Sequence, residues 1–389
     1  MLSVFLDNHS DALCVTVCLC EPLLAMLDSD KTTSSFCTEK DNPMTRYKTL
    51  FTTERGYRHQ QSALAAAPPQ LAVTVLRQPD RATLRAHLPE TEYFISERVG
   101  VIDAEMIQAA PKLKLILRLG SLTYDIDTSA AQAAGVAVCY WPQAGVIRVA
   151  EHMVMQMLAL GKKLRETETI ARTASAAWAE SKRTDEDTFA YNWSGRQGIT
   201  GLWQRTVGIL GFGEIGAELA RRLRGWDVTL LYYKRRRLPA TVEQELGLTY
   251  ADTDTLLRSS DYIANLLPYF PATDLWLNAE QFAKMKDGAY LVSCGSGSVI
   301  NEHDLAAAIQ SGKLGGAALD TFEWEPLPAD NRLLMLAGTN DNVLLTPHVA
   351  AGAGGRGNSA TNQHGDYTNI IYHIEGKPLR YRVTCLPSG

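Results

Sequence analysis

The stretch VGILGFGEIGAELARRLRG, residues 207–225, decides the fold, because it places the glycine spacing GxGxxG between a strand and a helix. Gly211 permits a tight turn, Gly213 lets a pyrophosphate approach the backbone, and Gly216 lets the helix pack closely on the strand. The start of the helix offers free N–H groups to an anion. The stretch predicts a dinucleotide-binding site, and a tight turn without a ligand is the alternative.

Strand candidates continue on both sides of this stretch, separated by helix-length connections. The strand at 207–210 and five later ones predict a six-stranded doubly wound sheet: VTLLYY (228–233), DYIANLL (261–267), AYLVS (289–293), GAALD (316–320) and NVLLTP (342–347). Five earlier candidates predict a second parallel sheet: 48–54, 71–76, 92–96, 113–120 and 136–141. Asp103 and Asp127 are expected N-caps of helices between them.

Three further segments surround these sheets. Residues 151–164 predict a long apolar helix, buried between domains or in a dimer interface. Residues 170–203 are polar and irregular, and their Tyr191, Trp193 and Trp203 are expected to pin this loop to the surface. Residues 362–379 predict an amphipathic helix that could return to the first sheet.

Composition excludes several classes of partner. Of the 389 residues, 46% are hydrophobic and 21% charged, and the formal net charge of -5 offers no basic field for nucleic acid or an anionic membrane. The seven cysteines lack the pairing of a zinc site, so no metal is expected. Residues 1–43 make a poor signal peptide, and we expect a weakly ordered extension there, with a small functional element as the alternative. A reducing, cytoplasmic location fits best.

The end of the second strand in the nucleotide-binding series indicates which nucleotide binds. NAD normally needs an acidic residue here to accept hydrogen bonds from the ribose hydroxyls. Lys234 stands in that position instead, followed by Arg235, Arg236 and Arg237. No carboxylate is left to repel a 2′-phosphate and several cations could bind it, so NADP is favoured over NAD; a solvated basic surface is the alternative.

At this point the sequence resembles the D-isomer-specific 2-hydroxyacid dehydrogenase family. The resemblance runs from about Met44 to Val383 and is carried by RVAEHMVMQMLAL (148–160), TVGILGFGEIG (206–216), NLLPYFPAT (265–273), GKLGGAALDTFEWEPLP (312–328) and LLTPHVAAG (344–352). It implies a Rossmann-type sheet, residues 149–348, inserted in a flavodoxin-like α/β substrate domain, residues 44–148 and 349–389. It also implies a homodimer and a small-molecule substrate.

The resemblance further implies a catalytic Arg, Glu and His. His348 matches the acid/base of hydride transfer and Glu325 matches the carboxylate that orients it. The arginine does not carry over, because Ser296 stands in its position within LVSCGSGSVINEHDL, residues 291–305. The expected cofactor contacts are Gly211, Gly213, Glu214, Ile215, Gly216, Lys234, Arg235, Pro268, Cys294 and Asp320.

The substrate side departs from the family elsewhere too. In the family, backbone N–H groups of the loop after the fourth strand hold a carboxylate; here this loop begins Gly120-Ser121-Leu122 and lacks the usual second glycine and acid. Ser121, Leu122 and Arg98 are the expected substrate contacts, and Arg98 or Arg118 could replace the missing cation if either is more than a surface or structural arginine.

These observations predict an NAD(P)-dependent oxidoreductase acting on a hydroxy or keto substrate related to, but different from, simple 2-hydroxy acids. A substrate that needs less positive charge, such as a neutral carbonyl compound, would suit Ser296. A catalytically weak NAD(P)H-binding regulatory protein of the same fold is the alternative, and a non-redox use of the bound nucleotide is a third reading.

Overall fold

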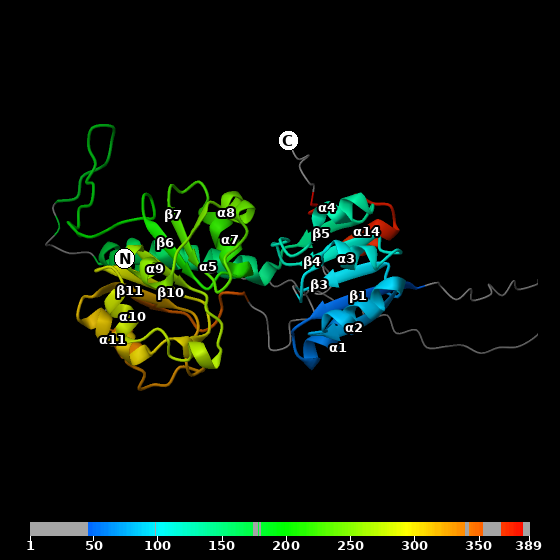
Figure 1. The fold of residues 1–389 in the computed structure, drawn as a ribbon. Coiled ribbons are helices and arrows are strands. Elements are labelled where there is room, and N and C mark those ends of the chain that lie inside the picture. Colours follow the sequence, from blue (N-terminus) through cyan, green and yellow to red (C-terminus); the bar gives the residue numbers. More distant parts are fainter. Residues whose placement is uncertain are drawn as a thin grey trace, which may run out of the picture. The chain divides into compact units, whose positions relative to one another are not determined.

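The first sheet is parallel and has the strand order β2-β1-β3-β4-β5 (Figure 1), which is the flavodoxin-like order. The computed structural model describes residues 46–97, 99–173, 178, 180–338, 342–352 and 367–383, all in a unit that begins at Thr45. The expected extension over residues 1–43 lies outside the described residues. The five strands, each inside its predicted stretch or one residue beyond it, are β1 Tyr47–Thr53, β2 Leu71–Arg77, β3 Tyr93–Ser96, β4 Leu115–Leu119 and β5 Ala137–Trp141.

Helices pack on both faces of this first sheet. Those between its strands are α1 Tyr57–Ala65, α2 Arg81–His87, the 3-10 helix η1 Leu88–Glu90, α3 Ala104–Gln108 and α4 Thr128–Ala133. The predicted N-caps are confirmed, since Asp103 accepts a hydrogen bond from Met106 N–H and Asp127 accepts one from Ala130 N–H. Late in the chain, α14 (Thr368–Ile374) returns to this sheet, where Ile370 packs with Phe51 and Leu117.

The second sheet has seven parallel strands in the order β12-β11-β10-β9-β6-β7-β8. They are β6 Thr206–Leu210, β7 Thr229–Tyr233, β8 Leu248–Tyr250, β9 Tyr262–Asn265, β10 Ala289–Ser293, β11 Leu314–Leu319 and β12 Val343–Leu345. The prediction of six strands was therefore wrong by one. The missing strand, β8, is only three residues long and pairs with β7 alone, too short to show a period in the sequence.

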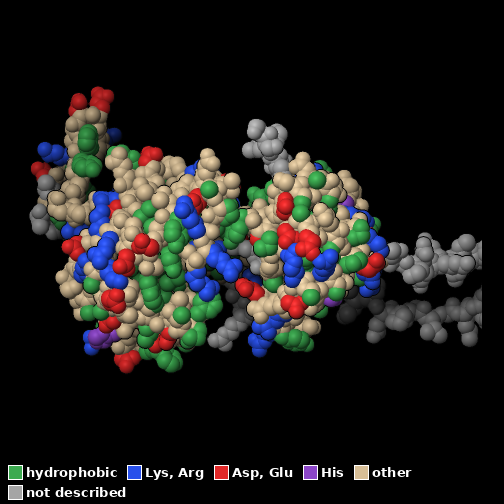
Figure 2. Space-filling model, in the orientation of Figure 1, with side chains coloured by type: hydrophobic (Ala, Val, Ile, Leu, Met, Phe, Trp, Pro, Cys, Tyr) green, Lys and Arg blue, Asp and Glu red, His purple; other side chains and the backbone are tan. Residues whose placement is uncertain are grey.

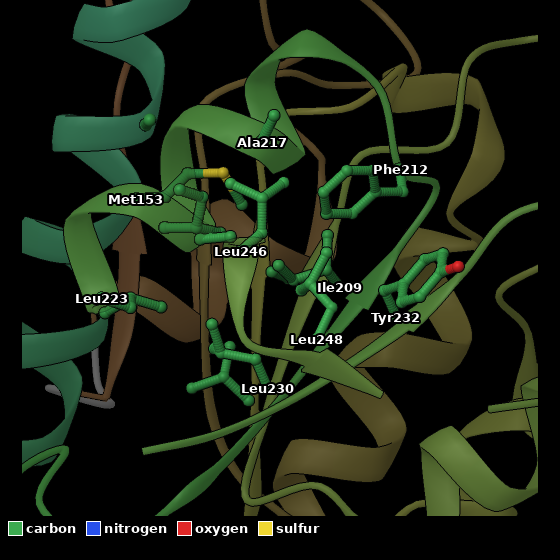
Figure 3. Close-up of a cluster of buried hydrophobic side chains, with 14 of the residues drawn as sticks. Met153, Ile209, Phe212, Ala217, Leu223, Leu230, Tyr232, Leu246 and Leu248 are labelled. Carbon is green, nitrogen blue, oxygen red and sulfur yellow. The ribbon is translucent and has the colours of Figure 1, made fainter. Parts of the chain in front are cut away.

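The helices of this second series are α5 Ala144–Gly161, α6 Leu164–Arg172, α7 Glu214–Leu223, α8 Ala240–Leu246, α9 Thr253–Ser259, η2 Pro271–Thr273, α10 Ala279–Lys284, η3 Gly297–Val299, α11 Glu302–Gln310 and α12 Arg332–Ala337. Helix α5 begins well before the predicted residue 151. Its Met153 packs with Ile209, Ala217 and Leu223 beneath α7 (Figure 3), so this face of α5 is buried within the chain.

Two expectations about the remaining segments need correction. In the loop expected over residues 170–203, two of the three aromatic side chains are not pinned to the surface: Tyr191 is 89% exposed and Trp203 66% exposed. Trp193 does contact the ring of Trp178, with centroids 5.1 Å apart. The helix expected over residues 362–379 ends at Ile374, before Gly376 in a left-handed conformation and Pro378. Residues 362–366 of that prediction lie outside the described residues.

Figure 2 shows basic and acidic side chains interspersed over the face drawn, with hydrophobic side chains exposed among them. In the part of the chain that the structure describes, no helix has the length and apolar character needed to cross a membrane. The same residues contain no group of three or more histidine, cysteine or carboxylate side chains placed to share a metal ion.

Candidate functional site

Loops that follow the second sheet's strands carry almost all of the expected site residues. Because all seven strands are parallel, their carboxyl ends lie at one edge, which is where ligands of such sheets bind. Six segments carry these residues: 211–216 after β6, 234–237 after β7, 266–268 after β9, 294–298 after β10, 320–325 after β11 and 346–352 after β12. The side chains that they carry come from residues far apart in the sequence.

The three fingerprint glycines meet different surroundings. A Cβ on Gly211, whose φ is +88°, would lie 2.8 Å from the backbone of Leu266, and one on Gly216 would lie 3.0 Å from the ring of Phe212. A Cβ on Gly213 would meet nothing within 4 Å. Gly211 and Gly216 are thus required by packing, whereas Gly213 borders open space at the start of α7.

That open space suits an anion. Helix α7 begins at Glu214, and its N-cap residue, Gly213, makes no side-chain hydrogen bond to the first turn, which is the arrangement found where helix starts bind anions. Ile215 lies in the same first turn and is half-buried. The open space at Gly213 and the uncapped helix start together fit a dinucleotide pyrophosphate.

In the basic run after β7, one arginine is paired with a carboxylate, whereas two other cations form no ion pair among the described residues. Arg237 forms two 2.8 Å hydrogen bonds to Glu243, and these bonds, with one from Tyr232, lower the Glu243 pKa to about 2. Lys234 donates to the Tyr124 hydroxyl at 3.0 Å, and the Arg235 guanidinium lies 5.2 Å from the Phe270 ring centroid. Among the described residues, Lys234 and Arg235 form no ion pair, so both charges can meet a phosphate.

The expected acid/base pair is brought together. Nδ1 of His348 lies 2.8 Å from Oε2 of Glu325, and Oε1 of Glu325 accepts a 3.0 Å hydrogen bond from Phe322 N–H. Glu325 is therefore held at one oxygen while it orients the imidazole with the other. The His348 side chain is 59% exposed and its backbone is left-handed, with φ 53°. Nε2 is consequently the ring nitrogen that can exchange a proton with a bound molecule.

Asp320 fixes the backbone just beyond His348. Its side chain is 1% exposed, and its Oδ1 accepts hydrogen bonds from Thr346 Oγ1 at 2.6 Å and Val349 N–H at 3.0 Å. Its Oδ2 accepts a 2.8 Å bond from Ala350 N–H. Both oxygens are engaged within the chain, so a cofactor contact, as expected from the sequence, would have to share them.

The loop that carries Ser296 packs against the segment that holds Glu325. Ser296 N–H donates to Leu267 O at 3.0 Å, and Thr321 Oγ1 donates to Gly295 O at 2.6 Å. A Cβ on Gly297 would lie 2.0 Å from the Phe322 backbone. Ser296 is half-buried, and no hydrogen bond of its hydroxyl is found among the described residues.

Two other expected cofactor contacts lie at the same edge. Pro268 is exposed directly beyond the end of β9, and its carbonyl accepts a 2.8 Å hydrogen bond from Thr273 Oγ1. Cys294 is half-buried, with Sγ 3.7 Å from Gln156 Oε1. Burial, with a smaller effect from Asp320, raises the pKa of the Cys294 thiol, so this thiol stays protonated and is a poor nucleophile.

The loop after β4 meets the start of α7. Ser121 N–H and Oγ donate to Glu214 Oε2 at 2.7 and 3.0 Å, and Leu122 packs with residues of the second sheet. Arg118 is buried, donates to Ser96 Oγ at 2.9 Å and pairs with Asp125, so it is a structural arginine rather than a substitute cation. Arg98 lies outside the described residues.

Residues 154–350 match the NAD binding domain of D-isomer specific 2-hydroxyacid dehydrogenases. The chain is 35% identical over 281 residues to a D-3-phosphoglycerate dehydrogenase of Archaeoglobus fulgidus, which covers 72% of this chain and 49% of that one. It is also 35% identical over 270 residues to glyoxylate/hydroxypyruvate reductase B of Yersinia pestis, covering 69% and 77%. A crystal structure of a Pyrococcus horikoshii protein is 27% identical, covers 87% and 95%, and gives a TM-score of 0.50.

This chain belongs to the D-isomer specific 2-hydroxyacid dehydrogenase family, and its second sheet lies in the family's NAD-binding domain. The family predicted from the sequence motifs is confirmed. The chain spans about half the length of the phosphoglycerate dehydrogenases that it matches, 49% and 51% of them.

Sequence reasoning missed the contacts that cross between the two sheets. The sequence does not predict the hydrogen bond between Lys234 and Tyr124, and it predicts Glu214 only as a cofactor contact. An aromatic residue in a short loop after a buried strand was the one available signal for Tyr124. Nothing in the sequence pairs Glu214 with Ser121, 93 positions away.

Gly211→Ala is expected to lower the free energy of unfolding by about 2–4 kcal/mol, because the methyl group meets backbone and the left-handed φ is strained. Gly213→Ala should change it by less than about 0.5 kcal/mol yet weaken NADH binding. Urea denaturation and a fluorescence titration of both variants measure these effects. Equal stability losses in the two variants would contradict the assignment of open space to Gly213.

Asp320→Asn is expected to lower the free energy of unfolding by about 1–3 kcal/mol, because an amide NH2 would face a backbone N–H that has no other acceptor. The matched control is Asp287→Asn, whose side chain is 89% exposed in an ion pair with Lys313 and should change stability by less than about 0.5 kcal/mol. Urea denaturation compares the two variants. Equal midpoints of unfolding would show that the hydrogen bonds of Asp320 do not stabilise the fold.

Proposed function

We propose that this chain is an NAD(P)-dependent oxidoreductase that transfers hydride between a nicotinamide and a hydroxy or keto substrate, with His348 as acid/base. The observation that carries the proposal is the 2.8 Å contact between His348 Nδ1 and Glu325 Oε2. It stands at the same sheet edge as the glycine fingerprint, within a domain matched to the NAD-binding domain of this family. A histidine with one nitrogen on a carboxylate and the other exposed is the arrangement that proton exchange needs.

The nicotinamide cofactor, when bound, accepts or supplies the hydride. Gly213 and the N–H groups of Glu214 and Ile215 would hold its pyrophosphate, with Pro268 and Cys294 along the same edge. His348 Nε2 takes the proton from the substrate hydroxyl in oxidation, or returns it to the carbonyl oxygen in reduction. Glu325 stabilises the imidazolium in either direction, because its negative charge lies against Nδ1.

The substrate contacts proposed are Ser296, Ser121 and Leu122, with Arg98 as a further candidate. A serine hydroxyl can donate one neutral hydrogen bond to a carbonyl oxygen, whereas an arginine would supply a charge and a fork of donors. The proposed substrate is therefore a hydroxy or keto compound related to simple 2-hydroxy acids but bound with less positive charge.

NADP is the proposed cofactor in preference to NAD. Support comes from the end of β7, where Lys234 replaces the acid that would repel a 2′-phosphate, and where Lys234 and Arg235 form no ion pair among the described residues. Arg237 contributes less, because Glu243 already neutralises it. A doubly charged phosphate would gain charge-assisted hydrogen bonds from the two available cations.

The proposal extends to assembly and location. The substrate domain is proposed to comprise residues 44–148 and 349–389, and the dinucleotide-binding domain residues 149–348. Exposed Phe189, Tyr191 and Trp203 offer an apolar surface that a homodimer could cover. Among the described residues Cys139 and Cys294 are free thiols, which suits the proposed cytoplasmic location.

His348→Asn is expected to lower turnover on a panel of carbonyl compounds by about 10²–10⁴-fold, because asparagine tolerates the left-handed backbone but cannot transfer the proton. Glu325→Gln should reduce turnover through the same pair, and both variants should still bind NADPH in a fluorescence titration. His303→Asn is a matched control, since that histidine is also 59% exposed. Tight cofactor binding with no turnover by the unaltered chain would favour the regulatory alternative.

Lys234→Asp is expected to lower the preference for NADPH over NADH at least about tenfold, because a carboxylate there repels the 2′-phosphate and accepts from the ribose. Dissociation constants for both nucleotides, measured by fluorescence, give the ratio. Arg258→Ala removes an exposed cation of α9 and should leave the ratio unchanged. An unchanged ratio in Lys234→Asp would mean that Lys234 does not face the nucleotide's phosphate.

A further inference from the structure

A carboxylate already occupies the loop that the family resemblance assigns to a substrate carboxylate, and it belongs to the chain itself. Oε2 of Glu214 accepts hydrogen bonds from Ser121 N–H at 2.7 Å and from Ser121 Oγ at 3.0 Å. A backbone N–H and a hydroxyl that converge on one oxygen are the donors that a carboxylate seat requires. We call this pair of Ser121 donors the carboxylate seat.

Gly120 lies directly against the Glu214 carboxylate that occupies the carboxylate seat. Its φ is +115°, and a Cβ at this position would lie 2.6 Å from both Cδ and Oε1 of Glu214. Any side chain at residue 120 would therefore meet the Glu214 carboxylate. The positive φ at residue 120 also favours glycine at this position.

The rest of the loop is held in place around the carboxylate seat. Arg221, from the same helix as Glu214, donates to Ser121 O at 3.2 Å, and Lys234 donates to the Tyr124 hydroxyl at 3.0 Å. Leu122 is 3% exposed, in the cluster that also contains Met153 and Phe212. The seat is thus a packed arrangement that includes Glu214 rather than a chance surface contact.

We propose that Glu214 is a specificity-determining residue: its carboxylate occupies the seat and excludes substrates that carry a carboxylate next to the reacting carbonyl. The inference rests on the proposed function and sharpens its substrate class to a hydroxy or carbonyl compound that is uncharged at this position. Two anions cannot share one N–H and one hydroxyl, and each would repel the other at hydrogen-bonding distance.

Ser296, the other departure from the family on the substrate side, also disfavours a substrate that carries a carboxylate. Ser296 has no charge with which to attract a carboxylate, while Glu214 adds a negative charge where such a group would bind. A bound pyrophosphate at the start of α7 would add further negative charge beside Glu214 and favour its side chain on Ser121. Selection against anionic substrates is therefore expected to be at least as strong in the cofactor-bound protein.

The test measures binding of oxamate, a carboxylate probe that does not react, and of its uncharged methyl ester by calorimetry. Glu214→Ala removes the occupant, and Glu214→Gln removes only its charge. Each is expected to tighten oxamate binding about tenfold, the worth of a hydrogen bond to a charged group, and to leave methyl oxamate unchanged. Ser296→Arg added to Glu214→Ala should tighten oxamate further.

Glu245→Gln is the matched control, since it removes an exposed carboxylate 3.8 Å from Arg221 and should affect neither probe. Titrations are run with and without NADPH. Failure of NADPH to bind would count against the proposed function, whereas the ratio of oxamate affinities without NADPH still tests whether Glu214 excludes a carboxylate. The inference is overturned if the unaltered chain binds oxamate as tightly as both Glu214 variants do. Thermal unfolding of the variants shows that unchanged ratios come from folded protein.

Discussion

The candidate site depends on one buried carboxylate, that of Asp320. A carboxylate that is 1% exposed must have its oxygens satisfied, and Thr346, Val349 and Ala350 satisfy them. These bonds join the end of β11 to the residues on both sides of His348. The left-handed backbone at His348 is kept by this attachment, and the imidazole consequently reaches Glu325. Asp320 in this way positions the proposed acid/base pair, although its own side chain is not required to contact the transferred proton or hydride.

At the carboxyl edge of the second sheet, some residues stabilise the fold and others are available to a ligand. Gly211, Gly216 and Gly297 are glycines because backbone or side chains press against them, whereas Gly213 borders open space. Arg237 is neutralised by Glu243, while its neighbours Lys234 and Arg235 form no ion pair among the described residues. Neighbouring residues of one type can therefore differ in role, and the difference is visible only in the contacts that each residue makes.

Much of the fold could be predicted from the sequence because parallel strands are continuous apolar runs and the glycine spacing has a local cause. The five strands of the first sheet and the fingerprint followed from such patterns, whereas the Glu325–His348 pair followed from the family resemblance. Strand β8 was missed because three residues show no period. The exposure of Tyr191 and the meeting of Ser121 with Glu214 were missed because tertiary packing decides both, and no local pattern encodes a contact between the two sheets.

The loop around Ser296 is fixed by bonds that do not involve its side chain. Ser296 N–H binds Leu267 O, Thr321 holds the Gly295 carbonyl, and Gly297 lies against the Phe322 backbone. None of these contacts depends on the identity of the side chain at residue 296. A loop whose backbone is fixed in this way can accept a different side chain at residue 296 with little loss of fold stability, so sequence can diverge at this one position while the neighbouring positions stay constrained.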